Sequence, residues 1–325
     1  MSFQALHYNE WRLTASYIMP ASRHRYDLLH KRLDIFTRML QGLEKGDVRA
    51  LHRTRVASRR LRELLPILQL DHDVARKLGR RLRRVTDGLG AVRELDVVSM
   101  LLDELHESGR YDLGGLSRVA ASVAQDRAAA RKRLVAKLPA AELRRVAHKL
   151  EDIAQDLKSD GASNRRHEAA WRWAIDARIT RRAERLMAAM REAGAMYLAE
   201  RLHAVRIALK KLRYAVELAA EAAGEKTTAD LRTLKHAQEL LGRLHDRQIL
   251  IERVRQIQGA ASADLRAERE LEAILDTLEN DCRRLHARYV RDRAGLADLC
   301  ARAAARPHPV LASPGRRVAP RRVAS

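Results

Sequence analysis

The feature that most constrains the fold of this chain is an internal duplication. Residues 51–62 and 202–213 match at an offset of 151. The identical pairs are Leu51 and Leu202, His52 and His203, Arg55 and Arg206, Ala57 and Ala208, Leu61 and Leu212, and Arg62 and Arg213, while Arg59 and Arg60 stand opposite Lys210 and Lys211. A repeat that preserves both residue type and spacing predicts two related structural halves.

A second repeated block follows the first one in each half. "RRLRRVTDGLGAVRELDVV", residues 80–98, aligns with "RTLKHAQELLGRLHDRQIL", residues 232–250, at an offset of 152. The alignment pairs Arg80 with Arg232, Arg83 with Lys235, and Leu89-Gly90 with Leu241-Gly242. Because the two blocks recur in the same order, duplication explains the pattern better than coincidence does.

Both halves are predicted to be helical. The chain has 325 residues, of which only 4% are aromatic, and no segment alternates apolar and polar residues long enough to predict a strand. Apolar spacings of three and four instead predict an all-α protein. The expected helices lie near 24–45, 48–70, 72–90, 93–108, 116–137, 140–158, 165–192, 196–223, 228–243, 246–259 and 262–292.

The same pattern sets the expected domain limits. One domain is expected over residues 22–300, with a first half at about 22–158, the break "KSDGASN" at 158–164, and a second half at about 165–300. Each half is long enough to bury a core of its own. Residues 301–325 combine proline with many arginines and contain no acid, so we expect a disordered basic tail.

The expected location is the cytoplasm, without insertion into a membrane. The first residues, "MSFQALHYNEWRL", lack a charged segment followed by an apolar one, and no run of about 18 apolar residues occurs. The two cysteines, Cys282 and Cys300, have neither CxxC nor metal-ligand spacing, so no disulfide or zinc site is expected.

Each copy of the first block places its cations along one face of a helix. His52, Arg55, Arg59 and Arg62 fall within an arc of about 80° over about 15 Å, and His203, Arg206, Lys210 and Arg213 repeat this geometry. We call these two sets the stripes. Apolar residues occupy the opposite faces, so both stripes should point away from the cores of their own bundles.

The net charge of the chain is +22, which favours a polyanionic partner. Arginine forks bind phosphate oxygens in pairs, lysine adds a mobile charge, and histidine adds a donor that depends on pH, so the stripes suit a phosphate-rich chain. Two simpler explanations stay open. A charged face is normal on a surface helix, and a neighbouring helix could supply neutralising acids.

The repeated blocks resemble the signature segments of the CHAD family, the conserved histidine α-helical domain. The resemblance rests on "LHRTRVASRRLRELL", "LGAVRELDVV", "RLHAVRIALKKLRYAVE" and "QELLGRLHD" and covers about residues 22–300. It implies two four-helix bundles, related by a pseudo-twofold axis, whose signature helices line a basic groove that binds inorganic polyphosphate. It also implies an association with polyphosphate granules and with other proteins of those granules.

The resemblance also implies which residues bind. The expected polyphosphate-binding residues are His52, Arg55, Arg59, Arg60, Arg62, His203, Arg206, Lys210, Lys211 and Arg213, and four less specific candidates are Arg80, Arg83, Arg232 and Lys235. No catalytic residue, metal ligand or cofactor is expected. Phosphate beside His52 and His203 should favour their protonated forms, so binding should tighten on acidification.

Two other functions remain as alternatives. The charge and the basic tail would also suit a nucleic-acid-binding protein of the nucleoid type. A metal-dependent phosphohydrolase would need carboxylates that hold a divalent ion. Glu94, Asp96 and Asp246 are the acids nearest the blocks, and we expect them to orient arginines or cap helices. Tyr214 is expected to serve packing, and at least one of Trp171 and Trp173 is expected to pack in the core.

Overall fold

The computed structural model describes residues 21–44, 47–137, 140–159, 165–224, 228–260 and 265–305. Within these ranges the protein is helical and has no strand, which confirms the predicted fold class. The elements are α1 (Ala21–Glu44), α2 (Val48–Leu64), the 3-10 turn η1 (Leu65–Ile67), α3 (His72–Gly88), α4 (Gly90–Glu107), α5 (Leu113–Lys137), α6 (Ala140–Ser159), α7 (Arg165–Ala193), α8 (Ala199–Ala222), α9 (Ala229–Ala260) and α10 (Leu265–Ala304).

The two halves correspond in order, but two helices of the second half are interrupted in the first. At the repeat offset, α3 and α4 together match α9, and α5 and α6 together match α10. Gly88 ends α3 and Gly90 begins α4, whereas the residue equivalent to Gly88 in α9 is Leu240. Glycine destabilises a helix interior, so the extra glycine accounts for the break between α3 and α4.

Several predicted helix limits are wrong, including the end of the helix expected at 262–292, which continues to Ala304. The separate helices expected at 228–243 and 246–259 form the single helix α9, because no glycine or proline interrupts residues 243–246 and the buried side chains of Leu244 and Leu250 continue its apolar face. The helix expected at 48–70 ends at Leu64, where Pro66 enters a 3-10 turn.

The expected tail also begins too early. α10 continues to Ala304, and Cys300 and Ala303 are buried in the core, so the boundary at residue 300 lies inside a helix. The rest of the expected tail lies outside the described residues, as does most of the break expected at 158–164. No helix in the described part of the chain is long and apolar enough to cross a membrane.

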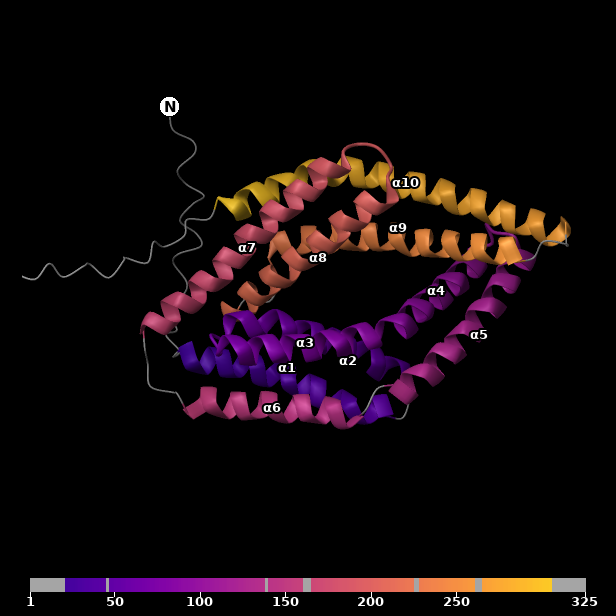
Figure 1. Cartoon of the computed structure of the whole chain (residues 1–325). Helices are drawn as coiled ribbons and strands as arrows, with labels where there is room; N and C mark the ends of the chain where they lie inside the picture. The colour runs from indigo at the N-terminus through magenta and orange to yellow at the C-terminus, as the bar shows by residue number, and fades with distance from the viewer. Residues whose placement is uncertain are drawn as a thin grey trace, which may run out of the picture.

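Most buried side chains belong to one large cluster, which we call the main core. It joins α1, α2, α3 and α6 to α7, α8, the first part of α9 and the last part of α10, with Phe36, Leu61, Val205, Leu241 and Tyr289 among its members. Figure 1 shows these two groups of helices as lower and upper layers. The arrangement is consistent with the expected pair of bundles. Trp171 packs in this core, as predicted, while Trp173 is exposed.

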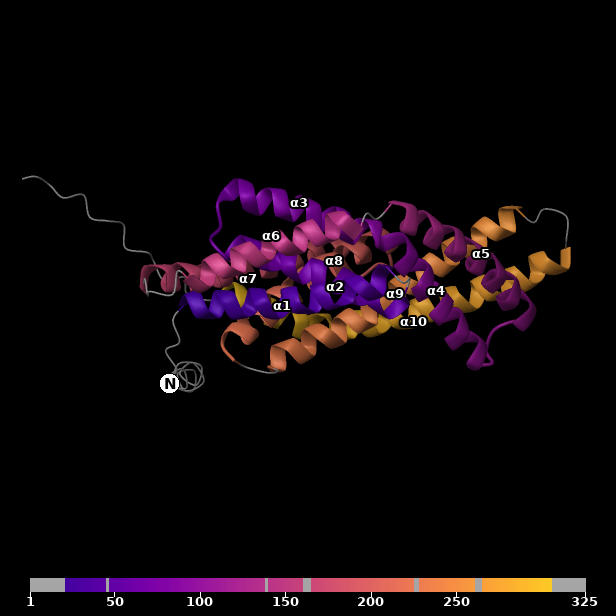
Figure 2. The same ribbon diagram turned by 90° about the horizontal axis from the view of Figure 1, so that it is seen from below.

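A second cluster, the distal core, lies at one end of the elongated molecule (Figures 1 and 2). It is formed by α4 and α5 with the last part of α9 and the first part of α10, and includes Leu102, Val119, Val254, Ile274 and Leu278. Each half is long enough to bury a core of its own, but the halves share both cores. Both cores combine helices of the two halves, because α4 and α5 pack against α9 and α10.

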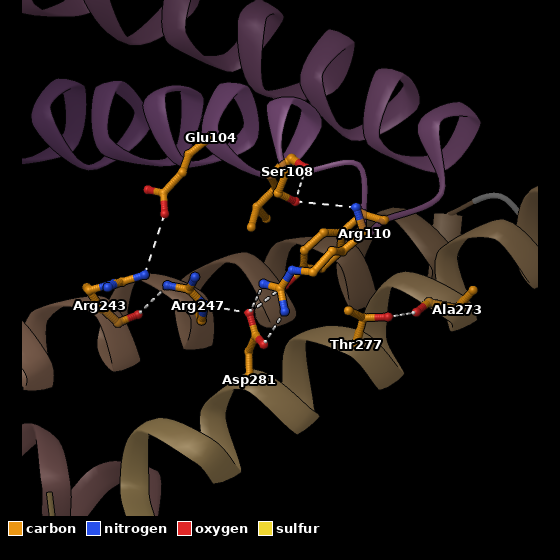
Figure 3. Close-up of polar contacts among 10 residues, drawn as sticks. Glu104, Ser108, Arg110, Arg243, Arg247, Ala273, Thr277 and Asp281 are labelled. Carbon is orange, nitrogen blue, oxygen red and sulfur yellow. Dashed lines mark hydrogen bonds and ion pairs between the residues drawn. The ribbon is translucent and has the colours of Figure 1, made fainter. Parts of the chain in front are cut away.

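A buried carboxylate links three segments of the chain at this end of the molecule. Asp281 of α10 accepts hydrogen bonds from the guanidinium of Arg110, at 3.1 and 3.3 Å, from Arg247 Nε at 3.3 Å and from the hydroxyl of Tyr111 at 2.9 Å. Figure 3 shows Arg110 reaching Asp281 from the segment after α4, while Arg247 approaches from α9. We call these four residues the Asp281 cluster. It ties the turn between α4 and α5 to both long helices.

Candidate anion-binding site

The two stripes lie on α2 and α8, and the inner faces of these helices hold them in place. Asp47 caps the start of α2 by accepting a hydrogen bond from the Arg49 amide. Ala57, Leu61 and Leu64 are buried beneath the first stripe, and Leu212 and Ala215 are buried beneath the second. The cations therefore project away from the core of their own layer, as the sequence predicts.

The structure brings the central cations of both stripes together. Lys210 of α8 lies close enough to Arg55 and Arg59 of α2 for their charges to lower its pKa. Arg93 of α4 approaches Arg55 from another side and also lowers its pKa, after burial as the larger cause. We call Arg55, Arg59, Arg93, Arg206 and Lys210 the cationic cluster. Three helices thus contribute positive charge to one place.

The cationic cluster is not neutralised by the protein. Within the described ranges, no carboxylate oxygen comes within 4.0 Å of a side-chain nitrogen of any of its five members. Arg55 donates only to a backbone carbonyl, that of Thr86, at 3.0 Å. Arg206 is partly buried, and its Nε is buried without a hydrogen-bond partner. Leaving such a donor unsatisfied costs free energy, which an anion that accepts its hydrogen bond would recover.

Burial and repulsion both act on Lys210. Burial is the larger cause and, together with the charges of Arg206, Arg59, Arg55 and Arg213, it lowers the pKa of Lys210 to about 7. Much of this side chain is consequently neutral near pH 7 in the free protein. An anion placed among these groups would raise the pKa and restore the ammonium charge.

Two carboxylates, those of Asp246 on α9 and of exposed Asp87 on α3, lie near the cluster without pairing with it. Burial raises the pKa of Asp246, and the nearby charges of Arg206, Arg93 and Lys210 oppose that effect only in part. Two acids do not balance five cations. We therefore expect the local potential to be strongly positive.

The two repeated histidines are held in different ways. His203 Nδ1 lies 3.2 Å from Nδ1 of His245 on α9, with ring centroids 4.5 Å apart, so one ring donates and the other accepts. Burial lowers the pKa of His203 and of His52, and nearby arginines lower both further. Burial, followed by the charge of Arg206, lowers the pKa of His245 to about 3. These histidines are neutral near pH 7.

Tyr214 links the stripes directly. Its hydroxyl accepts a hydrogen bond from Arg59 at 3.2 Å, and the Arg213 guanidinium lies over its ring, 4.8 Å from the centroid. The packing role predicted for Tyr214 is therefore accompanied by a polar one. Tyr214 is only partly buried, and it positions arginines from α2 and α8.

Several other predicted residues lie outside the cationic cluster. Arg213 donates to Gln238 at 2.7 Å and pairs with Glu217, and Arg60 lies 3.9 Å from the same carboxylate. A neighbouring acid therefore neutralises part of the second stripe. His52 and Arg60 also line a cavity of about 430 Å³ between α1 and α2. Among the described contacts, none involves the side chain of Arg62 or of exposed Lys211.

The four less specific candidates do not join the cluster. Arg80, Arg83, Arg232 and Lys235 are all exposed on α3 and α9. Arg83 lies 3.5 Å from Asp87 on its own helix. No interaction in the described part of the chain connects any of the four with α2 or α8.

Sequence reasoning missed Arg93 and His245 as members of the site. The signal was present, because these two residues are paired by the same offset of 152 that aligns the second block. Both follow the Leu-Gly dipeptide by three or four residues. They were overlooked within the aligned block because an arginine stands opposite a histidine, so the pair does not share a residue type.

The acids near the blocks separate into different roles. Asp96 is buried and accepts hydrogen bonds from Arg127 at 2.6 Å and Arg131 at 3.3 Å, so it orients arginines as predicted. Glu94 is exposed. In the described ranges, no three histidine, cysteine or acidic side chains gather as a potential metal site.

Comparison with known proteins decides the family. The family model of the CHAD domain matches residues 27–255, which include both stripes and both repeated blocks. The chain belongs to the CHAD family. The matched residues end within α9, so α10 lies beyond them.

Two solved structures share the CHAD fold of this chain. The crystal structure of the CHAD domain from the plant Ricinus communis is 22% identical, with a TM-score of 0.62, and the match covers 85% of this chain and 91% of that one. PptA from Streptomyces chartreusis is 20% identical, with a TM-score of 0.52, and the match covers 88% and 99%. No curated protein sequence matches this chain. At these identities the two likenesses establish the fold.

Proposed function

We propose that this protein binds inorganic polyphosphate, without catalysing a reaction, through the cationic cluster and the flanking parts of both stripes. The proposed ligand-binding residues are His52, Arg55, Arg59, Arg60, Arg62, His203, Arg206, Lys210, Lys211 and Arg213, to which we add Arg93. Membership of the CHAD family supports this proposal, since polyphosphate binding is the activity expected of the family. We further propose that the protein acts in the cytoplasm, at polyphosphate granules.

The observation that carries the proposal is the state of Arg206. Its Nε is buried without a hydrogen-bond partner, no carboxylate of the described residues forms an ion pair with it although Asp246 lies nearby, and Arg59 and Lys210 add further positive charge. Phosphate oxygens would accept hydrogen bonds from several of these groups at once. A ligand with many phosphates would then extend from the cluster along the stripes of α2 and α8, so affinity should rise with chain length.

The test is a titration with long-chain polyphosphate of wild type and of a variant with Arg55→Ala and Arg206→Ala. Each lost contact between a guanidinium and a phosphate costs about 1.5 to 3 kcal/mol, so the double variant should bind at least about 100-fold more weakly. Affinity of the wild type should also fall steeply as salt is raised, because each neutralised phosphate releases a counterion.

A matched control removes the same charge elsewhere. Arg145 of α6 and Arg181 of α7 are exposed and hydrogen bond only to backbone carbonyls of their own helices. The variant with Arg145→Ala and Arg181→Ala should bind within about threefold of wild type, since distant surface charges are screened. Equal losses in the two double variants would show that only net charge matters, and would contradict the proposal.

Competition separates polyphosphate from nucleic acid. At matched phosphate concentration, long-chain polyphosphate should release bound DNA, whereas DNA should not release bound polyphosphate. The reverse order would favour a nucleoid-type DNA or RNA binder. Release of inorganic phosphate from polyphosphate by the purified protein with magnesium or manganese would instead favour a phosphohydrolase.

A further inference from the structure

The cavity between α1 and α2, of about 430 Å³, lies beside the first stripe. Its lining comes from positions 32, 35, 38 and 39 of α1 and from positions 52, 53, 56, 57 and 60 of α2. Spacings of three and four place each set on one side of its helix, so two facing helix surfaces enclose the space. The volume falls within the range of about 300 to 1,000 Å³ that is usual for small-molecule sites.

Part of this lining is apolar. Ile35 and Met39 contribute to it from α1, and Val56 contributes from α2. Ile35 is 39% exposed, and the other two side chains are partly buried. Apolar side chains that share one cavity gain free energy when a ligand removes them from water. The ligand should therefore have an apolar part.

The rest of the lining is basic, and its own residues include no aspartate or glutamate. The side chain of Arg53 forms no ion pair within the described ranges, and Arg60 lies as far as 3.9 Å from Glu217. The other two arginines, at positions 32 and 38, are paired with acids that lie outside the lining. Since His52 adds another potential donor, the ligand should also carry negative charge.

We propose that this cavity binds a nucleotide, with its planar base against the apolar side chains and its phosphates beside Arg53 and Arg60. Arginine suits both parts of such a ligand, because guanidinium groups stack on planar rings and bind phosphate oxygens in pairs. The sulfur of Met39 also makes favourable contacts with aromatic rings. A fatty acid, with one negative charge and no ring, would use neither property fully.

The proposed nucleotide site adjoins the polyphosphate site without coinciding with it. His52 and Arg60 belong to both, whereas Arg53 and the apolar side chains belong to the cavity alone. Arg55 and Arg206 of the cationic cluster do not line the cavity. Nucleotide binding is therefore independent of the proposed function, and the two can be tested separately.

The experiment titrates the full chain with ATP by calorimetry, in buffer without divalent cations. Met39→Glu puts a carboxylate into the cavity that repels the phosphates, so ATP affinity should fall by at least about tenfold. Met39→Leu keeps the apolar lining and should bind ATP about as well as wild type. The control Met196→Glu adds the same charge at a side chain that is 73% exposed between α7 and α8. Equal losses in the two glutamate variants would overturn the inference.

A second variant avoids any disturbance of packing. Arg53 is exposed, so Arg53→Ala leaves the core intact. It should weaken ATP binding by about tenfold, the typical effect of one charged hydrogen bond. Unchanged ATP affinity in Arg53→Ala would overturn the inference, whether or not Met39→Glu folds.

The last comparison separates the two sites. The variant with Arg55→Ala and Arg206→Ala should keep its affinity for ATP, and a large loss there would assign the nucleotide to the cationic cluster and overturn the inference. In this variant, tripolyphosphate has the phosphates without the base and should bind at least about fivefold more weakly than ATP. Equal affinities would exclude a role for the base. If wild type bound ATP through Arg53 but did not bind polyphosphate, the proposed function would be wrong and the nucleotide site would stand.

Discussion

Two of the partly buried places where arginines gather differ in whether the fold supplies their counter-charge. In the Asp281 cluster, two arginines and a tyrosine donate to one carboxylate. In the cationic cluster, five cations from α2, α4 and α8 meet without a carboxylate in ion-pair distance. Arginine content alone therefore does not identify a binding site. What marks it is a set of buried cations for which the fold provides no partner.

The largest effect on stability should come from disrupting the Asp281 cluster. Asp281→Asn removes the charge that compensates Arg247, whose side chain is only 4% exposed, and should lower the free energy of unfolding by about 3 kcal/mol. Urea denaturation measures this loss. Asp276→Asn, at an exposed position of the same helix, should change stability by less than about 0.5 kcal/mol. A loss of similar size in both variants would mean that the Asp281 cluster does not hold the distal core.

The same carboxylate should make the distal core sensitive to acid. Burial alone would raise the pKa of Asp281, but hydrogen bonds from Arg110 and Tyr111 and the nearby charge of Arg247 outweigh it, and the pKa is lowered. Its stabilising contribution is therefore complete above the pKa of an unfolded aspartate, near 3.9, and is lost as the pH falls through the lower folded value.

A second effect concerns the cationic cluster and the pH dependence of polyphosphate binding. Polyphosphate should raise the pKa of Lys210 from its value of about 7, so the complex takes up close to one proton above that pH. Wild-type affinity should fall as the pH rises from 7 to 9, by at most about tenfold per unit. Lys210→Arg keeps its charge over this range, and its affinity should be nearly flat.

This expectation differs from the one drawn from the sequence, which assigned the pH response to His52 and His203. Both histidines have lowered pKa values, so their protonation is displaced to more acidic conditions. If wild type and Lys210→Arg responded equally between pH 7 and 9, the proton would have to be taken up elsewhere.

The smallest effect is one of stability. Lys210→Met removes a cation that is repelled in the folded state, so it should stabilise the free protein by about 1 kcal/mol at pH 6 while weakening polyphosphate binding. Because the folded pKa of Lys210 is lower than the unfolded value, the penalty is full below about pH 7 and disappears above about pH 10.5. Thermal melts of Lys210→Met and the exposed control Lys211→Met at pH 6 and 10 would show it, and a gain shared by the two variants would speak against repulsion at Lys210.

Much of the fold follows from the sequence because it depends on local pattern. Apolar spacing predicts the helices, and the repeat predicts which helices correspond. Leu61 and Leu212 are buried where the helical period places them. The continuity of α9 was missed, and so was the distal core, which forms only because α4 and α5 pack against the other half. Contacts between segments that are distant in the sequence cannot be predicted from the spacing of apolar residues within one helix.

The candidate site shows the same division. The stripes are predicted from the sequence, and their roles as ligand-binding residues remain predictions. What the sequence could not provide is the pairing across helices. Gln238 of α9 accepts a hydrogen bond from Arg213, and Tyr214 accepts one from Arg59, because α8 faces both α9 and α2. The ion pair of Arg213 with Glu217, by contrast, is an i,i+4 pair within α8. The buried Nε of Arg206 likewise lacks a hydrogen-bond partner although Asp246 of α9 lies near enough for the two charges to interact.

The unbroken helices α9 and α10 have a consequence for how the protein melts. Each of them contributes side chains to both apolar clusters, Leu241 and Val254 in the one case and Leu278 and Leu296 in the other. If either the main core or the distal core unfolds, α9 and α10 lose contacts on which the other core also depends. Heat or denaturant should therefore unfold the whole described body in one cooperative transition, although the chain arose by joining two copies of a smaller unit.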